Sequence, residues 1–184
     1  MGAWANAACD GVLAALSLGL AVRSRGDAAP CAGWAVMGVA AALGALRYAG
    51  LGELSPAHGF VSSLSGWVSL PLVALHGRLH WRSVLALGVT GVSLVVVDVP
   101  AAAQILVGAV AVLVLALFFG RSRLWGGLVG VAGFPLAALL IGTQGQLAGL
   151  DRLDLYHLSL AMSAALVGIS IPVPHPAGLG RVHS

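Results

Sequence analysis

Lysine is absent from the 184 residues, and all nine basic residues are arginine. A retinal photoreceptor forms its Schiff base on a lysine, so this class of seven-helix membrane protein is excluded. The arginines stand singly or in pairs at the ends of apolar segments, a distribution typical of membrane proteins and not of nucleic-acid binding.

Charge is also scarce, at 8% of residues, whereas a soluble domain carries about 25%. Hydrophobic residues make up 59% of the chain, and its mean hydropathy is +1.00. Because a soluble surface must be polar, this composition excludes a water-soluble globular protein. It predicts an all-α polytopic membrane protein with one transmembrane domain over residues 1–172 and a flexible cytoplasmic tail over 173–184.

Cysteine is limited to Cys9 and Cys31, which fall at opposite ends of their predicted helices, so no disulfide is expected. A cleavable signal peptide is not predicted either. The first apolar run contains Asp10 near its start and is followed by Arg23 and Arg25, which reverses the charge order of a signal peptide.

Apolar runs that can cross a bilayer need about 20 residues. Seven such runs are predicted, at residues 4–22, 32–50, 57–76, 81–97, 100–119, 124–143 and 154–172. The fourth and fifth are nearly continuous, but Asp98 and Pro100 lie between them. Proline interrupts a helix and a mid-bilayer aspartate is costly, so these residues predict a tight helical hairpin.

The arginines predict the orientation of a seven-helix bundle. Two of them, Arg47 and Arg152, would lie on one side, and seven on the other: Arg23, Arg25, Arg78, Arg82, Arg121, Arg123 and Arg181. The positive-inside rule then places the N-terminus outside and the C-terminus in the cytoplasm. We therefore expect a multi-pass protein of the plasma (inner) membrane.

Acids and histidines collect on the predicted outer side. Asp10, His58, Asp154 and His157 lie within or at the edge of apolar segments, where ionisable groups are expensive unless they are paired or functional. The alternative is that each is a solvated residue near the interface. His58 also begins a polar stripe at helical spacing, which should face the interior of the bundle and continues through Ser62, Ser65 and Ser69.

Asp154 and His157 are about one helical turn apart, so the carboxylate could orient the imidazole and raise its basicity. The same residues could equally form a structural ion pair with Arg47 or Arg152. Small residues follow on the same face, which predicts close approach of the first or third segment: Ala161, Ala164 and Gly168.

A second pair of histidines, His76 and His80, has the spacing of metal ligands on a helix. Gly77 follows the first of them, and Arg78 and Arg82 are interleaved. Binding of anionic lipid headgroups is therefore the favoured interpretation.

Seven helices, with His58 and Ser62 early and His157 in the last helix, resemble the ceramidase and adiponectin-receptor superfamily of seven-helix zinc hydrolases. That family carries His-x-x-x-His in its last helix, and Ala161 stands here in place of the second histidine. The resemblance implies zinc held by His58 and His157, with Asp10 or Asp154 replacing the lost ligand. Asp10 is taken as the third metal ligand, and Asp154 and His157 as the catalytic pair.

The chain also resembles a family of bacterial seven-helix integral membrane proteins to which no activity is assigned. The likeness rests on Asp10, on the sequence Ala-His-Gly-Phe at 57–60, and on Asp-Leu-Tyr-His at 154–157. It supports the choice of site residues and implies no particular chemistry.

Four functions stay open. The first is a non-catalytic membrane component, in which the polar cluster holds the bundle together. The second is a zinc-dependent hydrolase of a lipid-like substrate within the bilayer. The third is a proton or solute transport role that uses Asp10, His58, Asp154 and the serine stripe. The fourth is a haem bound between His58 and His157.

Overall fold

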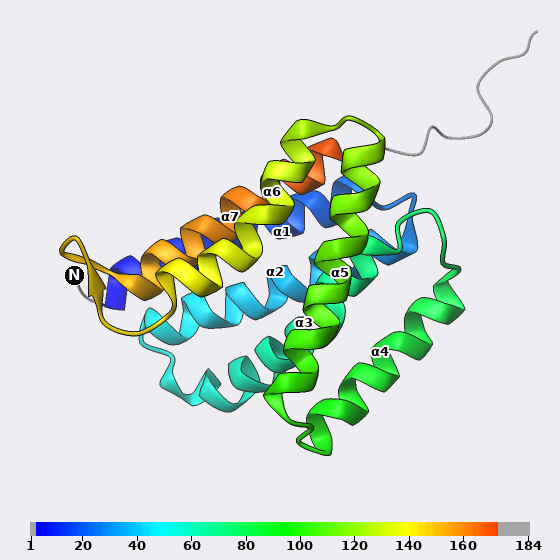
Figure 1. Ribbon diagram of the computed structural model, residues 1–184. Coiled ribbons are helices and arrows are strands. Elements are labelled where there is room, and N and C mark those ends of the chain that lie inside the picture. Colours follow the sequence, from blue (N-terminus) through cyan, green and yellow to red (C-terminus); the bar gives the residue numbers. More distant parts are fainter. Residues whose placement is uncertain (1–2, 173–184) are drawn as a thin grey trace, which may run out of the picture.

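The computed structural model describes residues 3–172 (Figure 1). The predicted tail at 173–184 lies outside the described residues. Within them the fold is all-α, with seven helices: α1 (Ala3–Arg23), α2 (Ala28–Tyr48), α3 (Ser55–Ala74), α4 (Trp81–Val96), α5 (Ala101–Arg121), α6 (Trp125–Leu136) and α7 (Arg152–Ser170). A 3-10 turn at Gly52–Leu54 precedes α3, and a π turn at Ala137–Ile141 extends α6.

Six of the helices form a closed ring. Around it α1 packs on α2, α2 on α3, α3 on α5, α5 on α6, α6 on α7, and α7 returns to α1. The fourth helix lies outside the ring against α3 and α2, and Gly91 is its one buried residue. Figure 1 shows α4 standing to one side of the other helices. Because the ring closes through α1 and α7, the two ends of the described chain lie on neighbouring helices.

Several helices have the length and composition of membrane spans. Four of them, α1, α2, α5 and α7, are long and apolar enough to cross a bilayer, and α4 and the segment Trp125–Ile141 are shorter apolar helices. The third helix has 20 residues but carries His58 and five serines, which lower its hydropathy. The chain is therefore an α-helical membrane protein, as its composition predicts.

Local sequence explains where two helices begin. The second helix starts at Ala28, four residues before the predicted 32, because the side chain of Asp27 caps it and accepts a bond from the amide of Ala29 at 3.3 Å. The predicted hairpin around Asp98 is confirmed: α4 ends at Val96 and α5 begins at Ala101, directly after Pro100. Asp98 has a φ of 55°, a conformation that aspartate tolerates better than most residues.

The segment between α6 and α7 contains a small antiparallel hairpin. Strand β1 (Gln146–Leu147) pairs with β2 (Leu150–Asp151), and the turn between them is formed by Ala148 and Gly149, both at positive φ. Two positive values of φ are typical of the two-residue turns that match the twist of paired strands. Asp151 then caps α7 by accepting a bond from the amide of Leu153 at 3.0 Å.

The two ends of the bundle differ. We call the end at which α1, α3, α5 and α7 begin the Asp10 end, and the end at which they finish the arginine end. The core at the arginine end is tightly filled by apolar side chains, among them the fully buried Trp34, Val73, Leu115 and Phe119. At the Asp10 end the apolar cluster is small, with Leu13, Ala14, Ala41 and Ala161. The ring is therefore sealed at one end and has space for a site at the other.

Candidate functional site

Two parallel helices bring Asp10 and His157 together. Asp10 lies seven residues into α1, and His157 lies five residues into α7, so both are about 8–10 Å from the start of their helices. The two helices pack side by side, because the face of α7 next to His157 consists of small residues, with Ala161 and Ala164 buried. Of the two predicted partners for this small face, the first segment is the one in contact.

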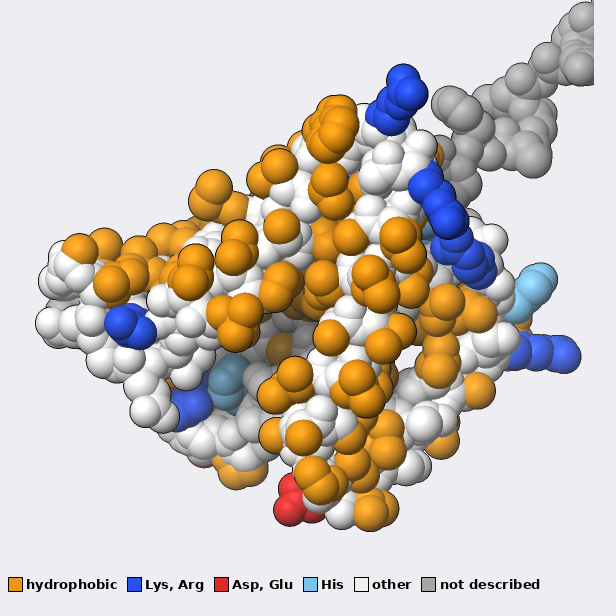
Figure 2. Space-filling view, viewed as in Figure 1, with side chains coloured by type: hydrophobic (Ala, Val, Ile, Leu, Met, Phe, Trp, Pro, Cys, Tyr) orange, Lys and Arg blue, Asp and Glu red, His pale blue; other side chains and the backbone are white. Residues whose placement is uncertain are grey.

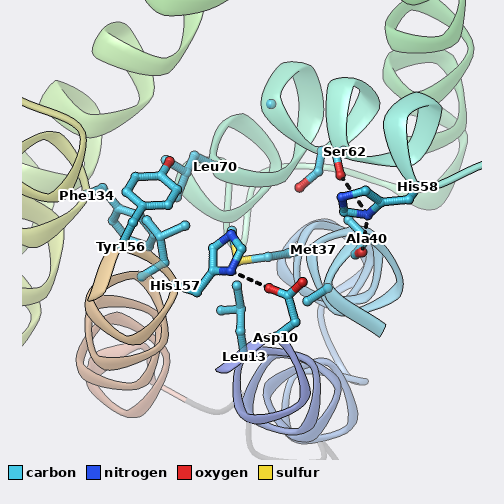
Figure 3. Close-up of a pocket in the computed structure, with 14 residues that line it drawn as sticks. Asp10, Leu13, Met37, Ala40, His58, Ser62, Leu70, Phe134, Tyr156 and His157 are labelled. Atoms are coloured by element: carbon cyan, nitrogen blue, oxygen red, sulfur yellow. Dashed lines mark hydrogen bonds and ion pairs between the residues drawn. The ribbon is translucent and has the colours of Figure 1, made fainter. Parts of the chain in front are cut away.

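The contact between these two side chains is short and shielded from solvent. Nδ1 of His157 lies 2.5 Å from Oδ1 of Asp10, and the two side chains are 15% and 2% exposed (Figure 3). Nδ1 of His157 is itself buried without a hydrogen-bond partner, so the two side chains meet at ion-pair distance without hydrogen-bond geometry. The second ring nitrogen, Nε2, points away from Asp10 in Figure 3 and is free to accept or donate a proton. The second oxygen of Asp10, Oδ2, is buried without a hydrogen-bond partner.

His58 approaches the same carboxylate from α3. Its Nδ1 lies 3.2 Å from the carbonyl oxygen of Ala40 and 3.3 Å from Oγ of Ser62, so Nδ1–H donates to the carbonyl and the ring is held in one orientation. Gly44 of α2 lies between this ring and Asp10. A Cβ at Gly44 would collide with Oδ2 of Asp10 and lie 3.0 Å from Cε1 of His58. The absence of a side chain at Gly44 therefore lets the acid and the second imidazole share one space.

These groups open into a cavity of about 280 Å³. The polar part of its wall includes Asp10, His58, Ser62, Ser65 and His157, and the rest is mostly apolar, with Leu13, Met37, Leu70, Phe134 and Leu160. Figure 3 shows these side chains converging from α1, α2, α3, α6 and α7. In Figure 2 the surface is hollowed between α5 and α6, and histidine atoms are visible at the edge of the hollow.

The predicted serine stripe of α3 faces the interior, as expected. Ser62 bonds His58, and Ser62 and Ser65 line the cavity. Ser65 and Ser69 are joined through their hydroxyls at 2.9 Å, and Ser69 is buried. The stripe therefore supplies polar surface to one wall of the cavity and ends in the sealed part of the bundle.

The sequence predicts that Asp154 orients His157, but among the described residues no hydrogen bond or ion pair joins the two. The acid at ion-pair distance from His157 is Asp10, from a different helix, whereas Asp154 is buried near the thiol of Cys9 with its Oδ1 unpartnered. Neither acid forms an ion pair with an arginine in this part of the chain. Arg152 bonds the carbonyl oxygen of Ile141 at 2.9 Å, and Arg47 stacks on the ring of Tyr48 at 5.1 Å. The helical spacing of Asp154 and His157 put them one turn apart but did not make them partners.

The zinc site implied by the superfamily resemblance does not fit these residues. Within residues 3–172, no group of three His, Cys, Asp or Glu side chains is arranged to hold a metal ion. Oδ1 of Asp10 is engaged by Nδ1 of His157, Nδ1 of His58 is engaged by a carbonyl, and Ala161 replaces the histidine that would complete the set. His58, His157 and Asp10 therefore share a cavity without the convergence that zinc needs.

His76 and His80, at the arginine end, do not form a helical pair. The third helix ends at Ala74, and Gly77 turns the chain with a φ of 67°. Oδ2 of Asp27 accepts a bond from the amide of Gly77 at 2.5 Å and lies 3.8 Å from Nδ1 of His76, so Asp27 ties the start of α2 to the end of α3. Burial lowers the pKa of His76 despite the nearby Asp27, with a further lowering from Arg78, so this histidine favours its neutral form.

Sequence reasoning missed two residues of the site. Gly44 creates the space for Asp10, and its signal was present in α2 as a face of small residues that includes Ala40, Ala41 and Gly44. Tyr156 also lines the cavity, with its ring centroid 5.7 Å from that of His157. No local pattern distinguishes an interfacial tyrosine from one that turns inward.

The close approach at Gly44 gives a stability prediction. Replacing Gly44 by alanine forces a methyl group against Asp10 and His58, so the free energy of unfolding in detergent should fall by about 1–3 kcal/mol. Gly108→Ala, in the middle of α5, is the matched control, because a Cβ there meets nothing within 4 Å. It should be neutral or stabilising by up to about 1 kcal/mol.

Gly44→Ala should lower the free energy of unfolding by less in an Asp10→Ser background, because the shorter serine side chain leaves room for the methyl group. If Gly44→Ala and Gly108→Ala changed the free energy of unfolding by the same amount, the described packing at Gly44 would be contradicted.

Comparison with known proteins assigns no family to this chain. No family model matches it, and neither the curated proteins nor the solved structures gave a match. Both resemblances drawn from the sequence therefore stay predictions. The residues of the site are therefore the basis for any functional assignment, because proteins of one fold can have different functions.

Proposed function

We propose that the chain is a multi-pass protein of the plasma membrane with seven spans, its N-terminus outside and its C-terminus in the cytoplasm. Successive helices run in opposite directions through the bundle (Figure 1). Among the described residues, two arginines belong to the Asp10 end, Arg47 and Arg152, and six to the arginine end: Arg23, Arg25, Arg78, Arg82, Arg121 and Arg123. The positive-inside rule supports a cytoplasmic arginine end.

This orientation can be tested with single cysteines in a chain whose Cys9 and Cys31 have been replaced by serine. Gly52→Cys lies at the Asp10 end and Ser122→Cys at the arginine end, both in connecting segments. A membrane-impermeant maleimide added to intact cells should label the first and label the second only after lysis. The reverse pattern would overturn the orientation.

We further propose that the chain is a non-catalytic membrane component that binds a small amphipathic molecule in the cavity at the Asp10 end. The observation that carries this proposal is the buried contact between Asp10 and His157, which opens into an otherwise mostly apolar cavity. A few convergent polar groups in an apolar pocket are characteristic of ligand sites. A polar pair that served only to hold the bundle together would need no such space.

The wall chemistry indicates the class of ligand. Oδ2 of Asp10 is buried and unpartnered, so it favours a hydrogen-bond donor or a cation and disfavours an anion. Nε2 of His157, which points away from Asp10, offers a separate hydrogen-bonding position. The volume of about 280 Å³ is slightly below the usual range of about 300–1,000 Å³, so the ligand is small. An alcohol or a primary amine with a short alkyl body meets these conditions.

The alternatives receive less support from the described residues. A zinc hydrolase lacks a converging ligand set. Transport would need a polar route to the arginine end, but the ring there is filled by Trp34, Val73 and Phe119, which are fully buried. The serine stripe ends at Ser69 within that core.

Octylamine, octanol and octanoate provide the test, because they share one chain and differ in the head group. Purified protein in detergent should be stabilised against heat by octylamine and octanol through Asp10 and His157, whereas octanoate, whose charge would face Asp10, should give no stabilisation that depends on these two residues. The stabilisation should disappear in Asp10→Asn and in His157→Gln.

Ser93→Ala, on the exposed face of α4 and outside the cavities at both ends of the bundle, is the control and should respond as the unaltered protein does. A uniform response to all three compounds that Asp10→Asn and His157→Gln leave unchanged would contradict binding at Asp10. One zinc ion per purified chain, lost in His157→Ala, would support the hydrolase instead.

A further inference from the structure

Two arginines converge on a second cavity, at the arginine end. This cavity of about 370 Å³ is lined by Arg78, from the turn after α3, and by Arg121 and Ser122, from the end of α5. Its remaining walls are Val114, Leu117 and Phe118 of α5. The guanidinium of Arg78 is held near the end of α3 by the carbonyl oxygens of Ala74 and His76, at 3.3 and 3.4 Å.

The positive charge in this cavity is not neutralised by the protein. None of the residues that line it is acidic, and within residues 3–172 neither arginine forms a salt bridge with a carboxylate. Asp27, the acid of the nearby turn, is engaged with Gly77 and His76. Two like charges at one site without a partner favour an anion, and paired guanidinium groups suit a phosphate.

An apolar groove continues from this cavity. A neighbouring space of about 340 Å³ lies between α3 and α5 and shares Val114 with the arginine cavity. All its lining residues are apolar, with Pro71, Ala74 and Leu75 on α3 facing Leu106, Val107, Val110 and Ala111 on α5. Because α4 stands away from this part of the bundle, the groove is open to the surroundings of the helices.

The length of the groove matches one leaflet of a bilayer. From Leu106 at one end of the groove to Leu117 in the arginine cavity, the α5 wall of the continuous site rises about 16 Å at 1.5 Å per residue. Half of a hydrocarbon core of about 30 Å is about 15 Å. The groove therefore spans the depth of an acyl chain and ends at the level where a headgroup phosphate would meet the arginines.

We propose that this continuous site binds one anionic phospholipid, with its phosphate between Arg78 and Arg121, near Ser122, and an acyl chain along the groove between α3 and α5. The cytoplasmic leaflet is the anionic one, which agrees with the orientation proposed above. The sequence predicts that anionic lipid headgroups bind at His76 and His80 with the interleaved Arg78 and Arg82. The proposed site keeps Arg78 and adds Arg121, while His76 packs edge-on against Phe118 with ring centroids 4.7 Å apart. The inference is independent of the ligand at Asp10.

Native mass spectrometry of the detergent-purified protein, titrated with dioleoyl phosphatidylglycerol or dioleoyl phosphatidylcholine, tests the proposal. One phosphatidylglycerol should bind at least about tenfold more tightly than phosphatidylcholine. The double variant Arg78→Gln with Arg121→Gln should weaken phosphatidylglycerol binding about thirtyfold, because each arginine near an anionic lipid contributes about fivefold. Val110→Trp, which narrows the groove from an exposed position, should weaken both lipids.

Arg47→Gln with Arg152→Gln removes the same charge from the Asp10 end and should leave the lipid affinities unchanged. Arg78→Lys with Arg121→Lys should retain most of the preference for phosphatidylglycerol. The proposal would be overturned if the two lipids bound with equal affinity, or if the two double glutamine variants lost the same affinity for phosphatidylglycerol. Displacement of the lipid by an equal concentration of glycerol phosphate would also overturn it.

Discussion

The contact between Asp10 and His157 is the interaction on which the rest of the arrangement depends. It joins α1 to α7, the two helices that close the ring, at a depth where solvent is excluded. A carboxylate and an imidazole in such a place are each unfavourable alone, and each is stabilised by the other at ion-pair distance. The small residues on α7 let α1 approach closely enough for this contact. The absence of a side chain at Gly44 leaves space for the carboxylate of Asp10.

This constraint divides the bundle into two halves with different tasks. The arginine end is filled by large apolar side chains, whose burial stabilises the bundle, and its exposed arginines can contact lipid headgroups. The Asp10 end keeps a cavity because two ionisable side chains and a histidine from α3 cannot be packed as densely as an apolar core. The two proposed sites, one for a small hydrogen-bond donor and one for an anionic lipid, follow this division.

The sequence predicted an all-α membrane protein and the hairpin at Asp98, because apolar length and proline placement are local properties. It also selected Asp10, His58 and His157, since ionisable residues in apolar segments are few. It could not pair them. Asp154 is nearer to His157 along the chain, but the partner is chosen by the packing of α1 on α7, which no single-helix pattern encodes. Gly44 was missed for the same reason, because its role depends on side chains from two other helices.

The most direct test of this account is a double-mutant cycle on Asp10 and His157, measured as the free energy of unfolding in a membrane-mimetic detergent. Asp10→Ala and His157→Ala should each cost about 3–5 kcal/mol, because each leaves the other group buried and unpaired. The double variant should cost less than the sum of the two, with a coupling of about 1–3 kcal/mol. Additivity of the two losses within about 0.5 kcal/mol would contradict the central role of the pair.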